Sequence, residues 1–386
     1  MIYQTIQQSE FDMSNSYEAR LKQKLIQLKW DNLHLDPLLL LGLIFLAAIG
    51  LFILYSASNA SEQVVVKQGY RIALSFALMF FFAQIPPNFY KRWAPWLYAI
   101  SFLLLIAVLI IGKVNMGGRR WISLGLFRFQ PSEFMTVAMP IILAWFLSEK
   151  VLPPKWPAIL LSGLMILLPA LLVAKEPDLG TAIVVTLSGF FVLLLAGIRW
   201  RFIGMLGGIL IGFSPLIWHF MHTYQKNRVL TFLNPERDPL GNGYHIIQSK
   251  IAIGSGGFFG KGWMHGTQSH LSFLPAHTTD FIFAVSGEEL GFIGCFIILA
   301  IFILIFLRCL IISLNAQDNF TRLLSGSLAL TFIMSAFINL GMVVGILPVV
   351  GVPLPLISYG GSSMTALMIN FGMIMSIHTH KRLWSS

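Results

Sequence analysis

Ten long apolar stretches separated by polar segments constrain this sequence more than any other feature. They lie at 38–56, 71–85, 93–112, 133–146, 158–174, 179–198, 202–221, 281–310, 323–345 and 362–377. A helix needs about 20 mostly apolar residues to cross a bilayer, where the backbone finds no water to bond. The pattern therefore predicts an all-α integral membrane protein with ten transmembrane helices and both termini on one side. The second and fourth stretches are short, which leaves nine or eleven spans as alternatives.

The composition excludes a soluble enzyme. Hydrophobic residues make up 56% of the 386 residues and charged residues 11%, whereas about a quarter of a soluble domain is charged. Apolar surface in this excess requires lipid, and so many spans leave no room for a sizeable soluble domain. We therefore interpret the chain as one membrane domain over 37–378.

The basic residues predict the orientation of this domain. They gather on the side of the N-terminus, at Arg20, Lys22, Lys24, Lys29, Lys91, Arg92, Lys150, Lys155, Arg199, Arg201, Arg308, Arg322, Lys381 and Arg382. Because short cytoplasmic loops carry the excess of Lys and Arg, residues 1–36 and 379–386 are predicted to be cytoplasmic. Residues 20–30 predict either a helix on the cytoplasmic leaflet or a solvated segment. The cations form no stripe, which excludes nucleic acid and favours anionic lipid or phosphate-bearing substrates.

One predicted outside loop departs from this charge rule. It holds Lys113, Arg119, Arg120 and Arg128. Two interpretations stay open: the side chains bind an anionic ligand, or they only reach toward lipid headgroups.

A second outside loop, 222–280, is far longer than an ordinary connection and is therefore predicted to be partly ordered and functional. Its apolar stretch Tyr244 to Ile253 predicts a short interfacial helix. The run from Gly254 to Gly262 is similar to a phosphate-binding loop, but Ser255 replaces the first glycine and Gly262 follows Lys261, which excludes a nucleotide site. A flexible backbone with Lys261 suits a bulky polar headgroup.

Acidic residues stand where the outside loops meet the spans. Asp280 closes the long loop, and it predicts either an N-cap for the next helix or a carboxylate available as a base. Glu288 and Glu289 follow two turns deeper, where a buried charge needs a partner or a cavity, while Glu133 and Asp178 begin other spans. Together these residues predict a polar site on the outer face.

The last outside loop, 346–361, contains Pro348, Pro353 and Pro355 before Ser358-Tyr359-Gly360-Gly361. Irregular backbone at membrane depth is tolerated only when it is buried in protein or lines a wet cavity. The loop predicts either a substrate groove or a plain hairpin outside the bilayer.

Several of these segments resemble the SEDS family of peptidoglycan glycosyltransferases. The matching motifs are residues 118–125 (GRRWISLG), 128–133 (RFQPSE), 176–181 (EPDLGT), 234–236 (NPE), 238–241 (DPLG), 243–262, 266–268 (GTQ), 280–285 (DFIFAV) and 345–361. They run in order over nearly the whole chain after the N-terminus. The stretch 243–257 and the short tail resemble the elongation branch of the family more than the division branch.

The resemblance implies ten spans, a bacterial inner membrane location and a periplasmic site that polymerises lipid II during elongation. It places the catalytic carboxylate on Asp280. For the substrate we predict Arg120, Arg228, Lys261, Gln248, Ser358, Tyr359 and Gly360, and as structural polar residues Glu133, Asp178 and Glu289. A divalent cation, Mg²⁺ or Mn²⁺, is a possible cofactor; a class B penicillin-binding transpeptidase and the elongation machinery are the implied partners. A lipid II flippase and a septal polymerase of the division branch are the alternatives.

Three positions depart from the family pattern. Thr136 stands where the family usually has a lysine that pairs with the Glu133 position, Ala276 replaces a glutamate, and Thr278 replaces a histidine, with His277 one place earlier. Without that lysine, we predict that Glu133 pairs with an arginine of the preceding loop, Arg120 or Arg128.

Overall fold

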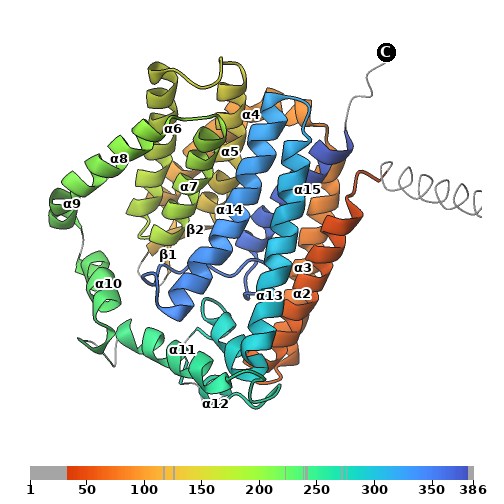
Figure 1. Cartoon of the computed structure of the whole chain (residues 1–386), viewed down its shortest axis with the longest axis vertical. Coiled ribbons are helices and arrows are strands. Elements are labelled where there is room, and N and C mark those ends of the chain that lie inside the picture. The colour runs from red at the N-terminus through yellow and green to blue at the C-terminus, as the bar shows by residue number, and fades with distance from the viewer. Residues whose placement is uncertain are drawn as a thin grey trace, which may run out of the picture.

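The computed structural model describes residues 33–115, 118–124, 127–221, 223–237, 239, 242–270, 273–274 and 276–380. These residues form a bundle of long helices with a cluster of short elements at one end (Figure 1). The predicted segment 20–30 lies outside the described residues.

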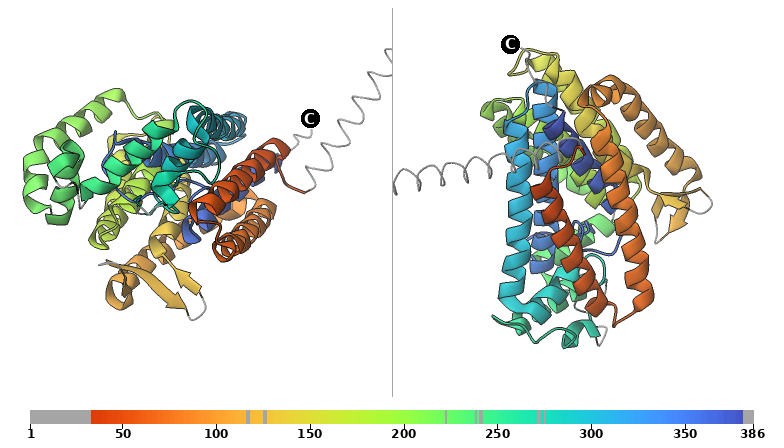
Figure 2. Two further views of the ribbon diagram at one scale, coloured as in Figure 1. Left: turned by 90° about the horizontal axis from the view of Figure 1, so that it is seen from below. Right: turned by 90° about the vertical axis from the view of Figure 1, so that its right-hand side faces the viewer.

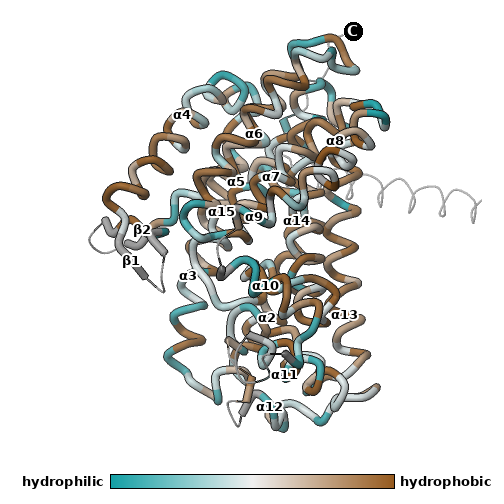
Figure 3. The backbone as a smooth tube through the Cα atoms, turned by 90° about the vertical axis from the view of Figure 1, so that its left-hand side faces the viewer, coloured by the Kyte–Doolittle hydropathy of each residue, from teal (hydrophilic) through white to brown (hydrophobic). Residues whose placement is uncertain are grey.

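In the described part of the chain, nine helices form the bundle. They are α2 (Pro37–Ala57), α3 (Glu62–Gln84), α4 (Pro87–Ile111), α5 (Pro131–Ser148), α6 (Trp156–Lys175), α7 (Leu179–Leu195), α13 (Ile282–Leu314), α14 (Asn319–Val344) and α15 (Ser362–Thr379). Among the described residues, seven helices are long and apolar enough to cross a membrane, and α7 is a shorter apolar helix. Hydrophobic residues cover most of their length (Figure 3). This confirms a multi-span helical protein, while the count of ten spans stays a prediction.

The expected single helix over 202–221 is wrong. The chain forms two helices there, α8 (Trp200–Gly212) and α9 (Ser214–Phe220). Pro215 lies just after the break; it has no N–H to donate, and its ring clashes with the carbonyl of a preceding helical turn.

Aspartate side chains fix the start of three bundle helices. Asp36, Asp178 and Asp318 each accept a hydrogen bond from the backbone N–H three residues on, at 2.8, 3.1 and 2.7 Å. Such caps satisfy N–H groups that have no partner inside the helix. The apolar runs therefore begin as helices at defined residues.

The core of the bundle lies between α13, α14 and α15. Phe332 of α14 contacts Phe302 of α13 and Phe371 of α15, with ring centroids 5.5 and 5.1 Å apart. In α14, 61% of the most apolar window is buried, against 17% in α3. Thus α14 is a central helix and α3 a peripheral one.

The two ends of the described chain meet at one end of the bundle. The rings of His34 and His380 stack at 3.9 Å. Close by, the buried Asp36 carboxylate accepts hydrogen bonds from the Arg308 guanidinium, at 2.5 Å for the shortest, and lies 3.3 Å from His378. This cluster ties α2, α13 and α15 together.

The short elements are β1 (Lys113–Asn115), β2 (Gly118–Leu124), β3 (Phe127–Phe129), α10 (Thr223–Leu233), a 3-10 turn (Pro235–Arg237), α11 (Asn242–Gly256) and α12 (Thr267–His270). Of these, α11 and α12 lie at the opposite end of the bundle (Figure 1). The helix expected at 244–253 is confirmed by α11. The strands form an antiparallel sheet in the order β1-β2-β3, beside α4 at the edge of the bundle (Figure 2). The sequence did not predict this sheet. The predicted all-α class is therefore corrected to a helical bundle with one small three-stranded sheet.

Helix α13 is interrupted at Gly291, and the long loop is anchored at that break. Gly291 has φ +66°, a conformation that favours glycine. The N–H groups of Phe292 and Ile293 donate to the carbonyls of Gly257 and Phe258, at 2.9 and 3.2 Å. The loop after α11 thus occupies the gap in the helix ladder and is held against the bundle.

Candidate active site

Asp280 does not cap the helix that follows it. Helix α13 begins at Ile282, its N-cap is Phe281, and no side chain caps it. In the described part of the chain the Asp280 carboxylate accepts no hydrogen bond. The N-cap interpretation is therefore wrong, and the carboxylate is available for chemistry.

The Asp280 side chain lines a cavity of about 190 Å³ between α10, α11 and the last outside loop. The lining residues are Arg228, Thr231, His245, Ile246, Ala276, Asp280, Phe281 and Val349. Burial raises the pKa of the Asp280 carboxyl above its ordinary value; the Arg228 guanidinium opposes this, and the Asp178 carboxylate adds to it. A carboxylate with a raised pKa beside a cation in a cavity has the properties of a general base.

His245 also lines this cavity, and the site prediction missed it. Its ring stacks on Phe281 at 5.6 Å, and its buried Nδ1 has no hydrogen-bond partner among the described residues. Burial lowers the pKa of the His245 imidazole, which favours the neutral ring. His245 belongs to the matching stretch 243–257, but its position on α11 gave no sign that it faces Asp280.

The last outside loop holds the backbone that carries Asp280. The Ser358 hydroxyl donates to the Thr279 carbonyl at 2.7 Å, and the Tyr359 N–H donates to the Thr278 carbonyl at 2.9 Å. From α14, the buried Asn339 amide donates to the carbonyls of Asp280 and Val352, at 2.9 and 2.8 Å. Five of the residues 352–358 have exposed fractions of 5% or less, which fits the buried loop and not the external hairpin.

Arg120 lies in a different place from the one predicted. Its guanidinium donates to the backbone carbonyls of Glu176 and Pro177, at 3.1 Å for the first. It thereby clamps the turn before α7 that ends in Asp178. The Asp178 carboxylate caps α7 and accepts a hydrogen bond from Gln130 at 2.9 Å. Burial raises the pKa of Glu176 to about 8, Asp178 adds to this rise, and Arg120 opposes it.

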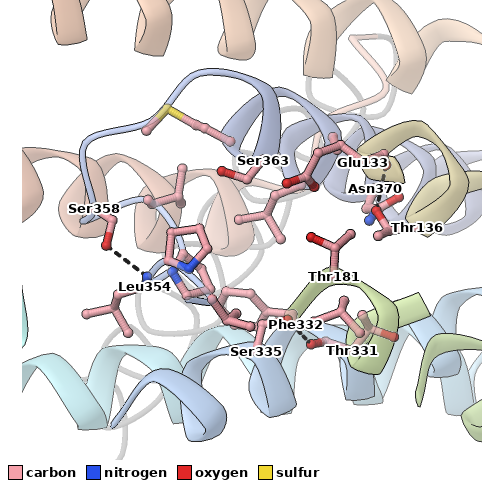
Figure 4. A pocket seen from close by; sticks show the side chains of 18 residues that line it. Glu133, Thr136, Thr181, Thr331, Phe332, Ser335, Leu354, Ser358, Ser363 and Asn370 are labelled. Carbon is pink, nitrogen blue, oxygen red and sulfur yellow. Dashed lines mark hydrogen bonds between the residues drawn. The ribbon is translucent and has the colours of Figure 1, made fainter. Parts of the chain in front are cut away.

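Glu133 faces a second, smaller cavity of about 80 Å³, which reaches from α5 to the last outside loop. Figure 4 shows Glu133 there with Thr136, Thr181, Ser363 and Asn370. The Thr136 hydroxyl donates to the Glu133 backbone carbonyl at 2.7 Å. The predicted pair between Glu133 and Arg120 is wrong, because Arg120 bonds to the turn before α7. The side chain of Arg128 lies outside the described residues.

Lys261 pairs with a buried acid instead of lining the cavity. Its ammonium lies 2.7 Å from Glu288 Oε1, and the Lys261 and Glu288 side chains are 28% and 0% exposed. The N–H groups of Thr267 and Gln268 also donate to Glu288, at 2.8 and 3.1 Å. These bonds fasten the segment 261–268 to α13.

Three further predicted residues lie around these features. The buried Glu289 accepts a hydrogen bond from the Ser56 hydroxyl at 2.6 Å. Gln248 is half-buried on α11, and Gly360 lies two residues before α15 begins at Ser362. The structure brings Arg228 together with Asp280, and places Arg120, Gln248, Lys261 and Glu133 outside the lining of that cavity.

The profile of a family of cell cycle proteins, FtsW/RodA/SpoVE, matches residues 32–383. The chain belongs to this family. Its spanning helices, the outer loops and Asp280 all fall within the matched region, so the FtsW/RodA/SpoVE profile covers the whole candidate site.

Individual FtsW/RodA/SpoVE members are also similar. The chain is 51% identical to the Escherichia coli K12 protein called peptidoglycan glycosyltransferase MrdB, over 92% of this chain and 96% of that protein. A solved chain from a peptidoglycan synthase complex that coordinates polymerization and crosslinking is 32% identical, with a TM-score of 0.77 over 89% of this chain and 97% of that one. The rod shape determining protein RodA of Thermus thermophilus is 28% identical, with a TM-score of 0.68 over 89% and 96%.

Proposed function

We propose that this chain is a peptidoglycan glycosyltransferase of the RodA type, which polymerises lipid II into glycan strands during cell elongation. The observation that carries the proposal is the Asp280 carboxylate, which lines a cavity with Arg228 and caps no helix. The 51% identity to a peptidoglycan glycosyltransferase over nearly the full length supports the same activity.

In the proposed reaction, the 4-hydroxyl of the acceptor sugar attacks the anomeric carbon of the donor. The O–H proton goes to the Asp280 carboxylate, a new glycosidic C–O bond forms, and the bond to the undecaprenyl diphosphate breaks. A single displacement inverts the anomeric configuration from α to β and needs one base. General base catalysis contributes typically about 10²–10⁴-fold.

The leaving diphosphate carries the charge that develops in this step. The Arg228 guanidinium lines the same cavity as Asp280 and supplies a fixed positive charge for that group. Arg228 also opposes the rise in the pKa of Asp280, so it keeps a larger fraction of the base ionised at neutral pH.

The residues described here offer no set of ligands for a metal held by protein alone. No group of three or more His, Cys, Asp or Glu side chains among them could hold a metal ion. A Mg²⁺ or Mn²⁺ ion in this site would therefore depend on substrate phosphates and water for most of its ligands. No step of the proposed reaction uses such an ion.

We assign the cavity to the periplasmic face of the inner membrane, with ten spans and both termini in the cytoplasm. The basic loops lie at the end where His34 meets His380, and the Asp280 cavity belongs to the other end. The isoprenoid tails of the substrate then stay in the bilayer while the sugars reach Asp280. A class B penicillin-binding transpeptidase is the proposed partner, in line with the similar chain of a synthase complex.

The test is to incubate the purified protein, alone and with its transpeptidase, with lipid II and to separate the products by size. Glycan polymer from the protein, absent from a sample without it, supports the proposal. A lipid II flippase would instead move fluorescent lipid II across a vesicle membrane and make no polymer. Complementation of elongation-deficient and division-deficient cells separates the elongation polymerase from a septal one, because only the former restores rod shape.

A further inference from the structure

Arg71 lies inside a membrane-spanning helix, and neither the sequence motifs nor the proposed reaction accounts for it. It is the tenth residue of α3 (Glu62–Gln84), so it lies about 13 Å below the outer end of that helix at 1.5 Å per residue. Arg71 stands where the apolar stretch 71–85 begins, and an ionised side chain at that level either reaches toward the headgroups or binds a ligand or a charged partner.

No carboxylate in the described part of the chain lies within ion-pairing distance of Arg71. Its guanidinium stacks over the ring of Tyr359, 4.5 Å from the centroid. One turn closer to the outer end, the exposed Lys67 is on the same stripe of α3 and also lacks a carboxylate partner among the described residues. Two neighbouring cations on one helix stripe repel each other, and a bound anion removes that cost.

The Arg71 side chain contacts the loop that holds Asp280. Tyr359, on which it stacks, donates its N–H to the Thr278 carbonyl at 2.9 Å. One turn above Arg71, the Gln68 amide donates to the Ser358 carbonyl at 3.3 Å. The Arg71 side chain also passes close to Gly361, where a built Cβ would lie 3.5 Å from Arg71 Cδ and Nε, an ordinary van der Waals contact. The cation is therefore fixed at the lipid-facing edge of the candidate site.

The position is distinct from the Arg228 position. Arg71 does not line the Asp280 cavity, and it reaches the loop from α3, a peripheral helix with 17% of its most apolar window buried. An anion approaching Arg71 would come from the outer leaflet, and its lipid tail could lie against the exposed face of α3.

We propose that Arg71, supported by the Tyr359 ring, binds the phosphate of a lipid-linked substrate, the diphosphate of an isoprenoid carrier. The inference rests on the proposed function, in which two such carriers must be present at once, one on the donor and one on the acceptor. Arg228 serves the diphosphate that leaves, and Arg71 holds a diphosphate at the bilayer edge. Guanidinium suits this task because it binds phosphate oxygens with two N–H groups and stacks on an aromatic ring.

The direct test measures binding of undecaprenyl diphosphate by native mass spectrometry, with the protein in nanodiscs of neutral lipid. Arg71→Gln should weaken binding about tenfold or more, since hydrogen bonds to charged groups contribute about 1.5–3 kcal/mol. Arg71→Lys should recover part of the affinity, and Tyr359→Leu should reduce it because the guanidinium loses its support. Arg92→Gln, which removes an exposed cation at the far end of the bundle, should leave the affinity unchanged.

A second arm separates the carrier diphosphate from ordinary anionic lipid. Phosphatidylglycerol added in excess should fail to displace undecaprenyl diphosphate from the native protein. Equal affinity of Arg71→Gln and the native protein, or full displacement by phosphatidylglycerol, would overturn the proposal.

Kinetics distinguish this inference from the proposed function. In polymerisation assays Arg71→Gln should raise KM for lipid II about tenfold and change kcat by less than about threefold, the signature of lost ground-state binding. If the native protein makes no polymer, the proposed function is wrong. The nanodisc measurement of undecaprenyl diphosphate binding still tests the role of Arg71 in that case. If Arg71→Gln does not fold, the affinities of Arg71→Lys and Tyr359→Leu for undecaprenyl diphosphate are compared with that of the native protein. Native affinity in both variants would contradict the proposal.

Discussion

Asn339 is the residue that we expect to fix the position of Asp280 from the bundle core. Its amide donates two hydrogen bonds, to the Asp280 and Val352 carbonyls, while its buried Oδ1 has no partner among the described residues. Asn339→Leu removes both donors and keeps the number and branching of the side-chain heavy atoms. The Asp280 backbone carbonyl then loses the hydrogen bond from Asn339, the only side chain of α14 that donates to it in the described structure.

The magnitude follows from these contacts. Each carbonyl left buried without a donor lowers stability by about 1–3 kcal/mol. Removal of the buried, unpaired Oδ1 raises stability by about the same amount as one such carbonyl costs. The free energy of unfolding should therefore fall by about 2 kcal/mol. A displacement of the base by about 1 Å costs about 100-fold in rate, so we expect kcat to fall about 10- to 100-fold.

Two assays check this prediction: SDS-titrated unfolding in mixed micelles and lipid II polymerisation by the folded variant. Ser327→Ala is the matched control, because Ser327 is buried on the same helix and donates only within it, to Leu324 O at 2.8 Å. The control should lose about 1 kcal/mol or less and keep kcat. An Asn339→Leu variant with native kcat would refute the idea that this amide positions Asp280.

Three further predictions concern single side chains around the site. Arg228→Gln removes the charge that opposes the raised pKa of Asp280; since the base must be ionised, the acid limb of the kcat/KM profile should move to higher pH, and an unmoved limb would contradict the assignment. Lys261→Met strips the cation from a buried carboxylate and should lower unfolding stability by about 2 kcal/mol with KM unchanged; a raised KM at native stability would instead return Lys261 to substrate binding. Thr136→Lys should be tolerated and should pair with Glu133, which a double-mutant cycle with Glu133→Gln detects as a coupling of about 1 kcal/mol, and zero coupling would exclude the pair.

The helices could be predicted because hydrophobic length alone defines a span. All ten apolar stretches contain helix, and the failure at 202–221 follows from one local residue, Pro215. The small sheet could not be predicted in this way: β1 and β3 have three residues each, too short to show an alternating pattern.

The candidate site was predictable only in part, because cavities depend on residues distant in sequence. Asp280 and Arg228 stand 52 positions apart and still line one cavity; the resemblance implied the role of Asp280, Arg228 was predicted because the leaving diphosphate needs a cation, and no local pattern showed that they meet. Lys261 and Glu288 look like separate charges in the sequence, yet they pair at 2.7 Å. Arg71 begins an apolar run and was counted as its boundary, because its Tyr359 partner lies 288 positions later.

The central claim, that Asp280 is the base of a glycan polymerase, is tested most directly by Asp280→Asn in the lipid II polymerisation assay with the transpeptidase present. The substitution preserves size, and the Asp280 side chain caps no helix, so the variant should insert and bind its partner normally. We predict that polymer formation falls by about 10²–10⁴-fold, the usual contribution of a general base. Polymerisation by Asp280→Asn within about tenfold of the native rate, under conditions where partner binding is intact, would contradict the account.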